Sequence, residues 1–330
     1  MPSTAKAKLL KAVQNKLQGA RARAPSCARS LVVMTDEPGW HGKVLRAAFA
    51  RHGFRTSFIS LSRCGFDLES RFGIRIPGFE DTLPDAVFVR GIASGSFEQV
   101  TLRLDALHAL QHLGVPVYNE ARAIERSVDK AMTSFLLKHA GIATLATWVT
   151  EAQELARRRL MHEAARGNEV VIKPLFGSQG VGLRRLTKGS ALPSGAAYAG
   201  VYYLQRFVDT GEGRWHDFRV LVVGGRAVAA MRRRGTSWIS NVARGASCES
   251  VPLDADLTYL AEACAHVLGL DYAGVDILRG ADGSAWVIEV NSMPAWSGLQ
   301  TVVSVDLAGL LAEDLVVRRL PQHSLTGTRP

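Results

Sequence analysis

The amino-acid sequence predicts an α/β protein that also carries α+β elements, and three observations predict this class. Strand-like and helix-like patterns alternate over residues 30–118, which is typical of a parallel sheet covered by helices. A β-branched strand at 170–172 runs directly into a glycine-rich loop. Near the C-terminus, two strand-like runs at 272–278 and 285–291 are joined through an Asp-Gly turn, which indicates a hairpin.

The size and composition suit a globular protein of two or three compact units. The chain has 330 residues, of which 47% are hydrophobic and 21% charged. No apolar run approaches the roughly 20 residues that a membrane-spanning helix needs, so we expect no membrane partner. The four cysteines are scattered without the spacing of a metal site, which favours a reducing, cytoplasmic location.

The basic character of the chain is concentrated at its N-terminus. Seven basic residues lie within positions 1–29 and no acidic residue precedes Asp36, so only +3 of the formal net charge of +10 belongs to the rest. The segment superficially resembles an organelle transit peptide, but it lacks the long apolar stretch of a secretory signal. We expect residues 1–29 to form a poorly ordered or docking extension.

An N-terminal α/β domain is expected over residues 30–118. Gly53 and Gly114 directly follow its two helical patterns, where glycine readily adopts the left-handed conformation that ends a helix. The expected strands are 30–36, 56–61, 84–90 and 115–118, and the expected helices are 40–52 and 97–113.

The pattern changes at Asn119, and we expect a central domain over 119–204 and a C-terminal domain over 205–330. Ser127 and Asp129 are typical start signals for a helix over 130–139. Further strands are expected at 146–149 and 202–208, with a helix over 151–165. The last domain should hold a hairpin at 218–234 that turns at two glycines, a helix over 254–268, and the final hairpin.

The glycine-rich loop after residue 172 has the chemistry of a polyphosphate site. Glycines at this density let the backbone point several N–H groups at an anion, and Lys173 adds a fixed positive charge beside them. The order of the glycines matches neither a P-loop nor the dinucleotide fingerprint, and a tight hairpin turn is the alternative. The loop residues concerned are Gly177, Ser178, Gln179, Gly180 and Gly182.

Three oxygen-bearing residues of the final hairpin point to a cation. Glu289 and Asn291 share one face of their strand because side chains alternate, and Asp276 lies on the partner strand. Ile288 and Val290 are then expected on the opposite face. Hard Mg²⁺ prefers such ligands and shares them with phosphate, although a polar sheet face that pairs with lysines would show the same pattern.

Lys130 begins the helix over 130–139 and would by itself be an ordinary surface lysine. Beside Lys173, the glycine-rich loop and the three oxygen ligands, it becomes a candidate for a second phosphate lysine.

Taken in order, these segments resemble the RimK family of ATP-grasp carboxylate–amine ligases. The matching pieces are VDK at 128–130, IKPLFGSQGVG, YLQRFV, HDFRV at 216–220, AGVDI and IEVN. The resemblance runs from about residue 30 to about residue 317 and leaves out the basic extension. It implies an ATP-grasp fold behind an N-terminal parallel-sheet α/β domain.

The resemblance also implies roles for individual residues. Lys130 and Lys173 would contact the α- and β-phosphates under the lid of residues 177–182. Gln205, Arg206 and Phe207 would read the adenine edge through the backbone, although the family often has Glu where this chain has Arg206. The D-x-R pair Asp217 and Arg219 would lie near substrate and phosphates. Asp276, Glu289 and Asn291 would hold two Mg²⁺ ions, for which Mn²⁺ can substitute.

The segment RRGTSWISNVARG at 233–245 narrows the resemblance to LysX-type and methanopterin-type glutamate ligases. The positions that carry over are Arg233, Asn241 and Arg244, and a guanidinium there can clamp an acyl phosphate or a carboxylate. Gly245 is followed by Ala246 where the RimK pattern usually has a second glycine.

These features imply an ATP-dependent ligase that joins L-glutamate to an acceptor carboxylate through an acyl phosphate, releasing ADP and phosphate. The acceptor could be a pterin such as tetrahydromethanopterin, a carrier protein or a ribosomal protein tail. We expect a homo-oligomer and no nucleic-acid partner. The alternative is a non-catalytic nucleotide-binding protein whose basic extension engages an acidic partner.

Overall fold

The computed structural model describes residues 29–177, 180–210, 215–239 and 245–320. The described residues divide into two compact units, one formed by residues 29–121 together with 315–320 and the other by those within 122–314. The expected boundary at 204/205 falls within a strand of the second unit, and the three-domain division stays a prediction.

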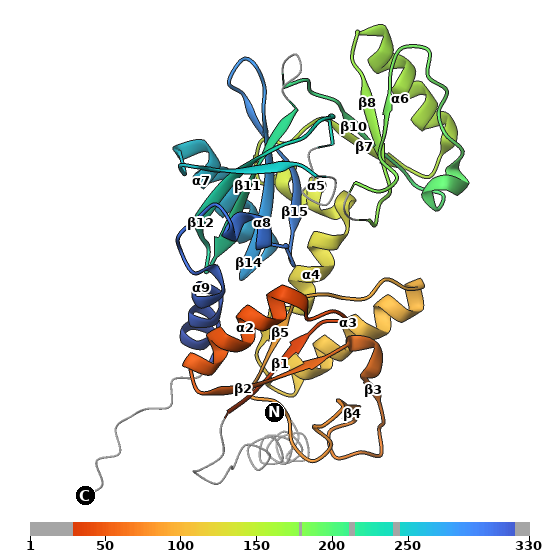
Figure 1. Ribbon diagram of the computed structural model, residues 1–330. Coiled ribbons are helices and arrows are strands. Elements are labelled where there is room, and N and C mark those ends of the chain that lie inside the picture. The colour runs from red at the N-terminus through yellow and green to blue at the C-terminus, as the bar shows by residue number, and fades with distance from the viewer. Residues whose placement is uncertain (1–28, 178–179, 211–214, 240–244, 321–330) are drawn as a thin grey trace, which may run out of the picture. The chain divides into compact units, whose positions relative to one another are not determined.

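The first unit is built on a four-stranded parallel sheet in the order β2-β1-β5-β6. Helices α2 and α3 pack beside it (Figure 1). Its strands are β1 (Arg29–Met34), β2 (Phe54–Ile59), β5 (Ala86–Val89) and β6 (Val117–Tyr118), and its helices are α2 (Gly39–Arg51) and α3 (Phe97–His112). The expected α/β alternation is confirmed here, because every expected strand and helix of this region is present.

The centre of this sheet is fully apolar, as the runs of β-branched residues predict. Val32, Val33, Val87 and Phe88 have no exposed surface, which is typical of a parallel sheet covered on both faces. Helix α3 begins with a capping box, in which the Ser96 side chain accepts from the backbone N–H of Gln99.

The second unit holds two antiparallel sheets, and the smaller has the order β7-β10-β8-β9. Helix α6 covers it through a cluster that includes Leu160, Ile172 and Leu204. The elements are β7 (Thr147–Thr150), α6 (Gln153–Ala165), β8 (Val170–Lys173), β9 (Arg184–Leu186) and β10 (Tyr202–Arg206). Helix α5 (Lys130–His139) precedes them, with the Asp129 side chain accepting from Ala131 N and Met132 N as its N-cap.

The larger sheet has the order β13-β12-β11-β14-β15. Its strands are β11 (His216–Val223), β12 (Arg226–Arg234), β13 (Ser247–Val251), β14 (Tyr272–Arg279) and β15 (Ala285–Asn291). Helix α7 (Ala255–Leu268) packs on this sheet, and its residues Ala261, Cys264 and Leu268 have no exposed surface. Both expected hairpins are confirmed, β11–β12 and β14–β15.

Several short elements were not expected from the sequence. They are η1 (Leu61–Arg63), β3 (Gly65–Phe66), β4 (Ile74–Arg75), α4 (Ala121–Val128), β9, η2 (Gly195–Tyr198), β13, α8 (Ser297–Gln300), α9 (Leu307–Asp314) and η4 (Leu315–Arg319). Most are shorter than two helical turns or five strand residues, so periodicity has too few positions to reveal them.

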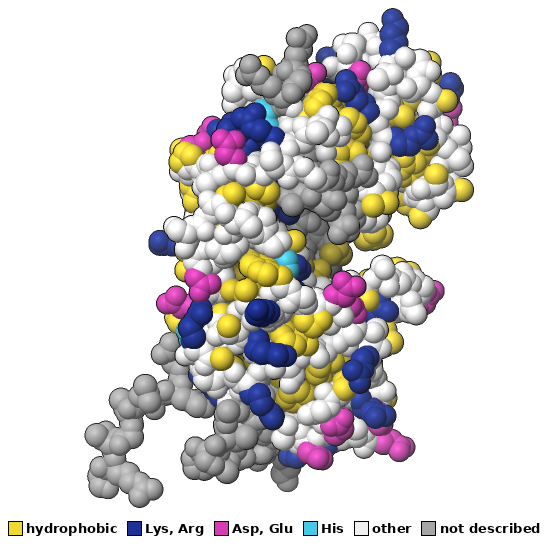
Figure 2. Space-filling model, viewed as in Figure 1, with side chains coloured by type: hydrophobic (Ala, Val, Ile, Leu, Met, Phe, Trp, Pro, Cys, Tyr) yellow, Lys and Arg dark blue, Asp and Glu magenta, His cyan; other side chains and the backbone are white. Residues whose placement is uncertain are grey.

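None of the helices in the described part of the chain has the length and apolar character that crossing a lipid bilayer requires. On the face seen in Figure 2, hydrophobic side chains are interspersed with Lys, Arg, Asp and Glu side chains.

Candidate active site

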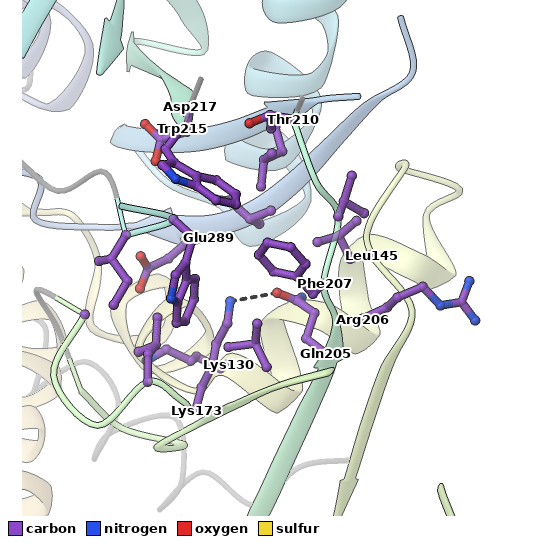
Figure 3. Close-up of a pocket in the computed structure, with 18 of the residues that line it drawn as sticks. Lys130, Leu145, Lys173, Gln205, Arg206, Phe207, Thr210, Trp215, Asp217 and Glu289 are labelled. Atoms are coloured by element: carbon purple, nitrogen blue, oxygen red, sulfur yellow. Dashed lines mark hydrogen bonds between the residues drawn. The ribbon is translucent and has the colours of Figure 1, made fainter. Parts of the chain in front are cut away.

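A pocket of about 970 Å³, its open mouth included, lies within the second unit. Strands β8, β10 and β15, helix α5 and the glycine-rich loop each contribute to it. Figure 3 shows Lys130, Lys173, Gln205 and Glu289 among the residues that line it. The lining includes nine residues singled out from the sequence: Lys130, Lys173, Gly177, Gly180, Gln205, Arg206, Phe207, Asp217 and Glu289.

The two lysines reach this pocket from different elements and are held by different partners. The Lys173 ammonium at the end of β8 donates to Gln205 Oε1 at 2.7 Å. Lys130 Nζ donates to Gly177 O at 2.9 Å and to Leu175 O at 3.3 Å, so it ties the start of α5 to the loop.

Burial and nearby carboxylates act in opposite directions on the pKa values of the two lysines. Burial lowers the pKa of Lys173 to about 8, while Glu289 acts in the opposite direction. Burial likewise lowers the pKa of Lys130, against the attraction of Glu289 and Asp129. Burial disfavours the charged form of a lysine unless enough negative charge lies nearby. A bound phosphate would supply that charge, so a buried lysine of this kind suits a phosphate site.

The glycine-rich loop requires glycine at specific positions. Gly182 has φ +76°, and a Cβ there would lie 2.7 Å from the Cγ of Pro174. Gly180 also has positive φ, at +70°. Gly177 does not, and a Cβ there would make only an ordinary contact with Pro174 at 3.6 Å. Ser178 and Gln179 lie outside the described residues.

Arg206, the last residue of β10, and Phe207 directly after it both line the pocket. The Arg206 side chain extends away from Lys173 and Glu289 (Figure 3) and donates to the buried Glu163 Oε2 at 2.9 Å. The Phe207 ring contacts Trp215 and Trp238 and lies under the Arg185 guanidinium, 3.9 Å from its centroid.

Four charged side chains at the pocket form a chain of ion pairs, in which Asp217, Arg233 and Asp276 are buried and Arg219 is partly buried. Arg233 Nε and Nη2 donate to the two oxygens of Asp217 at 2.6 and 2.7 Å, and Nη2 also lies 2.9 Å from Asp276 Oδ2. Arg219 donates to both oxygens of Asp276 at 2.7 Å. Burial would raise the pKa of Asp276, but the two guanidiniums hold it below its usual range.

These ion pairs bear on the substrate- and phosphate-binding roles that the sequence predicts for Arg219 and Arg233. Arg233 is only 2% exposed, and its Nε and Nη2 face Asp217 and Asp276, so its charge is used within the protein rather than presented to solvent. Arg219 and Arg233 do not line the pocket, whereas Asp217 does.

A β-bulge shapes the wall that carries Glu289. Asp276 pairs with Glu289 and Ile277 pairs with Val287, so Ile288 is the extra residue. Val287 and Val290 therefore lie in the apolar core while Ile288 and Glu289 both line the pocket. The expectation that Ile288 lies with Val290 on the opposite face was wrong, because the inserted residue breaks the period-2 alternation.

The donor set at the end of β15 fits a divalent cation. Within the described part of the chain, the Glu289 carboxylate has no hydrogen-bond or ion-pair partner, and Asn291 Nδ2 is buried without one. No three His, Cys, Asp or Glu side chains among the described residues come together as a metal site, so the expected ligand set of Asp276, Glu289 and Asn291 stays a prediction. The Glu289 carboxylate lines the pocket and suits Mg²⁺, whereas both oxygens of Asp276 already accept from Arg219.

Several lining residues were not singled out from the sequence. Trp238, within the segment that narrowed the resemblance, packs edge-to-face on Phe207 with centroids 6.0 Å apart. Leu145, Val171, Leu278 and Ile288 add apolar surface suited to a flat heterocycle. Their apolar character carries no signal in sequence, because most such residues lie in cores. Asn241 and Arg244 lie outside the described residues.

Comparison with known proteins agrees with this geometry. The sequence-family model of the RimK-like ATP-grasp domain matches residues 127–315 of this chain. A tetrahydromethanopterin:alpha-L-glutamate ligase of Methanococcus maripaludis is 36% identical over 233 residues, covering 69% of this chain and 77% of that protein. A protein of Teredinibacter turnerae, named "Probable alpha-L-glutamate ligase", is 32% identical over 289 residues, covering 86% of this chain and 93% of its own.

Solved structures give the same fold. The ATP-grasp ligase PsnB, complexed with minimal precursor, Mg and ADP, matches with a TM-score of 0.64 at 21% identity, covering 87% of this chain and 97% of PsnB. The expected ATP-grasp fold is confirmed, and the similar proteins are ligases. The chain is therefore an ATP-dependent ligase and belongs to the RimK-like ATP-grasp family.

Proposed function

We propose that this protein joins the amine of L-glutamate to an acceptor carboxylate at the expense of ATP. The observation that carries the proposal is the convergence of Lys130, Lys173 and Glu289 on one apolar-walled pocket. An acceptor oxygen attacks the γ-phosphorus, and the bond to the bridging oxygen breaks as ADP leaves. The glutamate nitrogen then attacks the acyl carbon, phosphate leaves and the amine loses a proton.

The residues divide this work by position. Lys130 and Lys173 hold the inner phosphates, the loop with Gly177 and Gly182 covers them, and Phe207 with Trp238 encloses the base. Asp276, Glu289 and Asn291 would hold Mg²⁺, which neutralises phosphate charge, and Mn²⁺ could take its place. Exclusion of water by the loop protects the acyl phosphate from hydrolysis.

L-Glutamate as the added amino acid is supported by the names of the two relatives, both alpha-L-glutamate ligases. The acceptor follows less directly, and the classes to be tested are a reduced pterin such as tetrahydromethanopterin and a peptide that ends in glutamate. The relatives do not favour the alternative of a non-catalytic nucleotide-binding protein.

The test incubates the full chain with ATP, Mg²⁺, one acceptor class and each amino acid in turn. We expect ADP and phosphate by chromatography and an acceptor heavier by one glutamyl residue by mass spectrometry. AMP with pyrophosphate would contradict the acyl-phosphate route, and an adduct of another amino acid would contradict only the glutamate assignment. Lys130→Ala and Lys173→Ala should each weaken ATP binding or turnover.

A further inference from the structure

Gln205 is almost fully buried, with 4% of its surface exposed, at the base of the pocket. We propose that Gln205 is a positioning residue that aims the ammonium group of Lys173 at the phosphates of ATP, through an amide whose orientation two hydroxyl groups determine. The inference rests on the proposed function, since it assigns a task to a residue of that same site.

The cross-strand register brings these side chains together. In the sheet β7-β10-β8-β9, Gln205 is the direct partner of Thr147 on β7. Lys173 on β8 is the partner of Tyr203, two residues from Gln205. Because side chains two apart share a face, Gln205 and Tyr203 both meet Lys173 and Thr147 on the same side of the sheet.

The first hydroxyl is that of Thr147. Thr147 Oγ1 donates its hydrogen to Leu145 O at 2.9 Å, so it can only accept from other neighbours. Gln205 Nε2 lies 3.1 Å from this oxygen and donates to it. The amide nitrogen is therefore required on the Thr147 side.

The second hydroxyl is that of Tyr203, and a short relay sets its direction. Ser134 Oγ donates to Lys130 O at 2.7 Å, so the Tyr203 hydroxyl, 2.8 Å away, donates to Ser134. Burial raises the pKa of Tyr203, which keeps this proton in place. Tyr203 is then an acceptor towards Gln205 Nε2, at 3.5 Å.

With both hydrogens of the amide directed at these hydroxyls, the carbonyl oxygen of Gln205 has to face Lys173. The resulting bond, 2.7 Å long, restrains the ammonium group while leaving its other hydrogens for a ligand (Figure 3). A flipped amide would turn an NH₂ group towards the ammonium and lose all three bonds. The relay also ends on the backbone of Lys130, so one network joins both lysines of the site.

The experiment measures binding of AMP-PNP with Mg²⁺, and of adenosine, to the full chain by titration calorimetry. Gln205→Met keeps the length of the side chain and removes both polar atoms. We expect AMP-PNP to bind roughly tenfold to hundredfold more weakly, as for loss of a hydrogen bond to a charged group, while adenosine affinity is unchanged. Equal weakening of both ligands would overturn the proposal in favour of a role in shaping the adenine pocket.

A matched pair of variants tests the orienting hydroxyl. Thr147→Val removes the acceptor with little change in shape and should weaken AMP-PNP binding in the same selective way, by less than Gln205→Met. Thr147→Ser keeps the hydroxyl and should retain wild-type affinity. A Thr147→Val variant that binds AMP-PNP as wild type does would contradict the orienting network.

A double-mutant comparison shows whether Gln205 acts through Lys173. In a Lys173→Met background, adding Gln205→Met should cause no further loss of AMP-PNP affinity, because the group to be positioned is gone. A full additional loss would overturn the proposal. Failure of the wild-type protein to bind AMP-PNP would instead contradict the proposed function itself.

Discussion

At the scale of single residues, the candidate site depends on which charges are already paired inside the protein. Asp276 accepts hydrogen bonds from two guanidiniums. Glu289 has no such partner among the described residues, and its negative charge acts on the pKa values of Lys130 and Lys173. Removing the Glu289 charge should therefore affect function far more than folding.

We expect Glu289→Gln to lower turnover by roughly a hundredfold or more at low Mg²⁺, because a weakened oxygen set holds the metal poorly. The thermal midpoint should stay close to the wild-type value, since no folded-state ion pair is lost. Glu249→Gln is the control, because Glu249 lies half-exposed on β13 of the same sheet and pairs with Arg232 and Arg234. Wild-type turnover in Glu289→Gln at low Mg²⁺ would remove this residue from the metal site.

The pKa of Lys173 predicts a pH dependence of nucleotide binding. Phosphate binds the charged lysine, and the lysine in the free protein loses its proton above a pKa of about 8. Affinity for AMP-PNP should therefore fall as pH rises through 8, by up to about tenfold per pH unit, with a proton taken up on binding. Calorimetry in buffers of different ionisation enthalpy measures both effects.

Lys173→Arg is the matched control for this pH dependence, because a guanidinium stays protonated throughout that range. Its affinity should vary much less with pH than that of the wild-type protein. The same slope in both proteins would assign the titration to another group.

At the scale of elements, two segments of the site are restricted in conformation. They are the loop between β8 and β9 and the end of β10. Gly182 combines a positive φ with close approach to Pro174, whereas Gly177 has neither. Arg206 forms the last position of β10, yet its side chain is directed to helix α6.

We expect Gly182→Ala to cost about 1–3 kcal/mol of local conformational strain and to weaken AMP-PNP binding, because the loop can no longer close in its native form. Gly177→Ala provides the comparison at the same loop, where the added methyl group meets only ordinary contact distances. Denaturant unfolding and nucleotide titration on both variants measure the difference. Equal effects of the two substitutions would show that backbone conformation at 182 is not limiting.

The Arg206→Ala variant tests whether Arg206 contacts the nucleotide through its backbone or through its side chain. It leaves the buried Glu163 carboxylate with fewer partners and should destabilise the fold by about 1–3 kcal/mol. Nucleotide affinity should remain close to wild type, since the guanidinium points away from the pocket. Arg158→Ala, which breaks an exposed pair on the same helix, should cost about 0–1 kcal/mol. A large loss of AMP-PNP affinity in folded Arg206→Ala would argue for a side-chain contact.

At the scale of the whole molecule, catalysis should reside in residues 122–314, which contain every described residue of the candidate site. The basic extension carries no ligand pattern, and Arg29 already belongs to β1, where its guanidinium lies 4.3 Å from the Phe54 ring centroid. Deletion of residues 1–28 should therefore leave turnover and thermal midpoint near wild type. A folded truncated protein that forms no product would refute this prediction, and a changed oligomeric state would show another task for the extension.

The sequence by itself determined the parallel sheet, the hairpins, the glycine-rich loop and the strand that carries Glu289 and Asn291. Each of these is encoded locally: in runs of β-branched residues, in glycines that ease tight turns, or in side chains two apart on a strand. The order of such segments was also specific enough to indicate the RimK-like family.

Only the tertiary structure decided which polar groups are engaged and which remain available. Lys173 meets Gln205 across 32 positions of sequence, Arg219 meets Asp276 across 57, and Arg206 meets Glu163 across 43. Local periodicity contains no information on such pairings, nor on the single inserted residue, Ile288, that turns Glu289 and its neighbour towards the same pocket. The physical reason is that an electrostatic partner is chosen by distance in space and by burial, which the fold sets after the strands have been aligned.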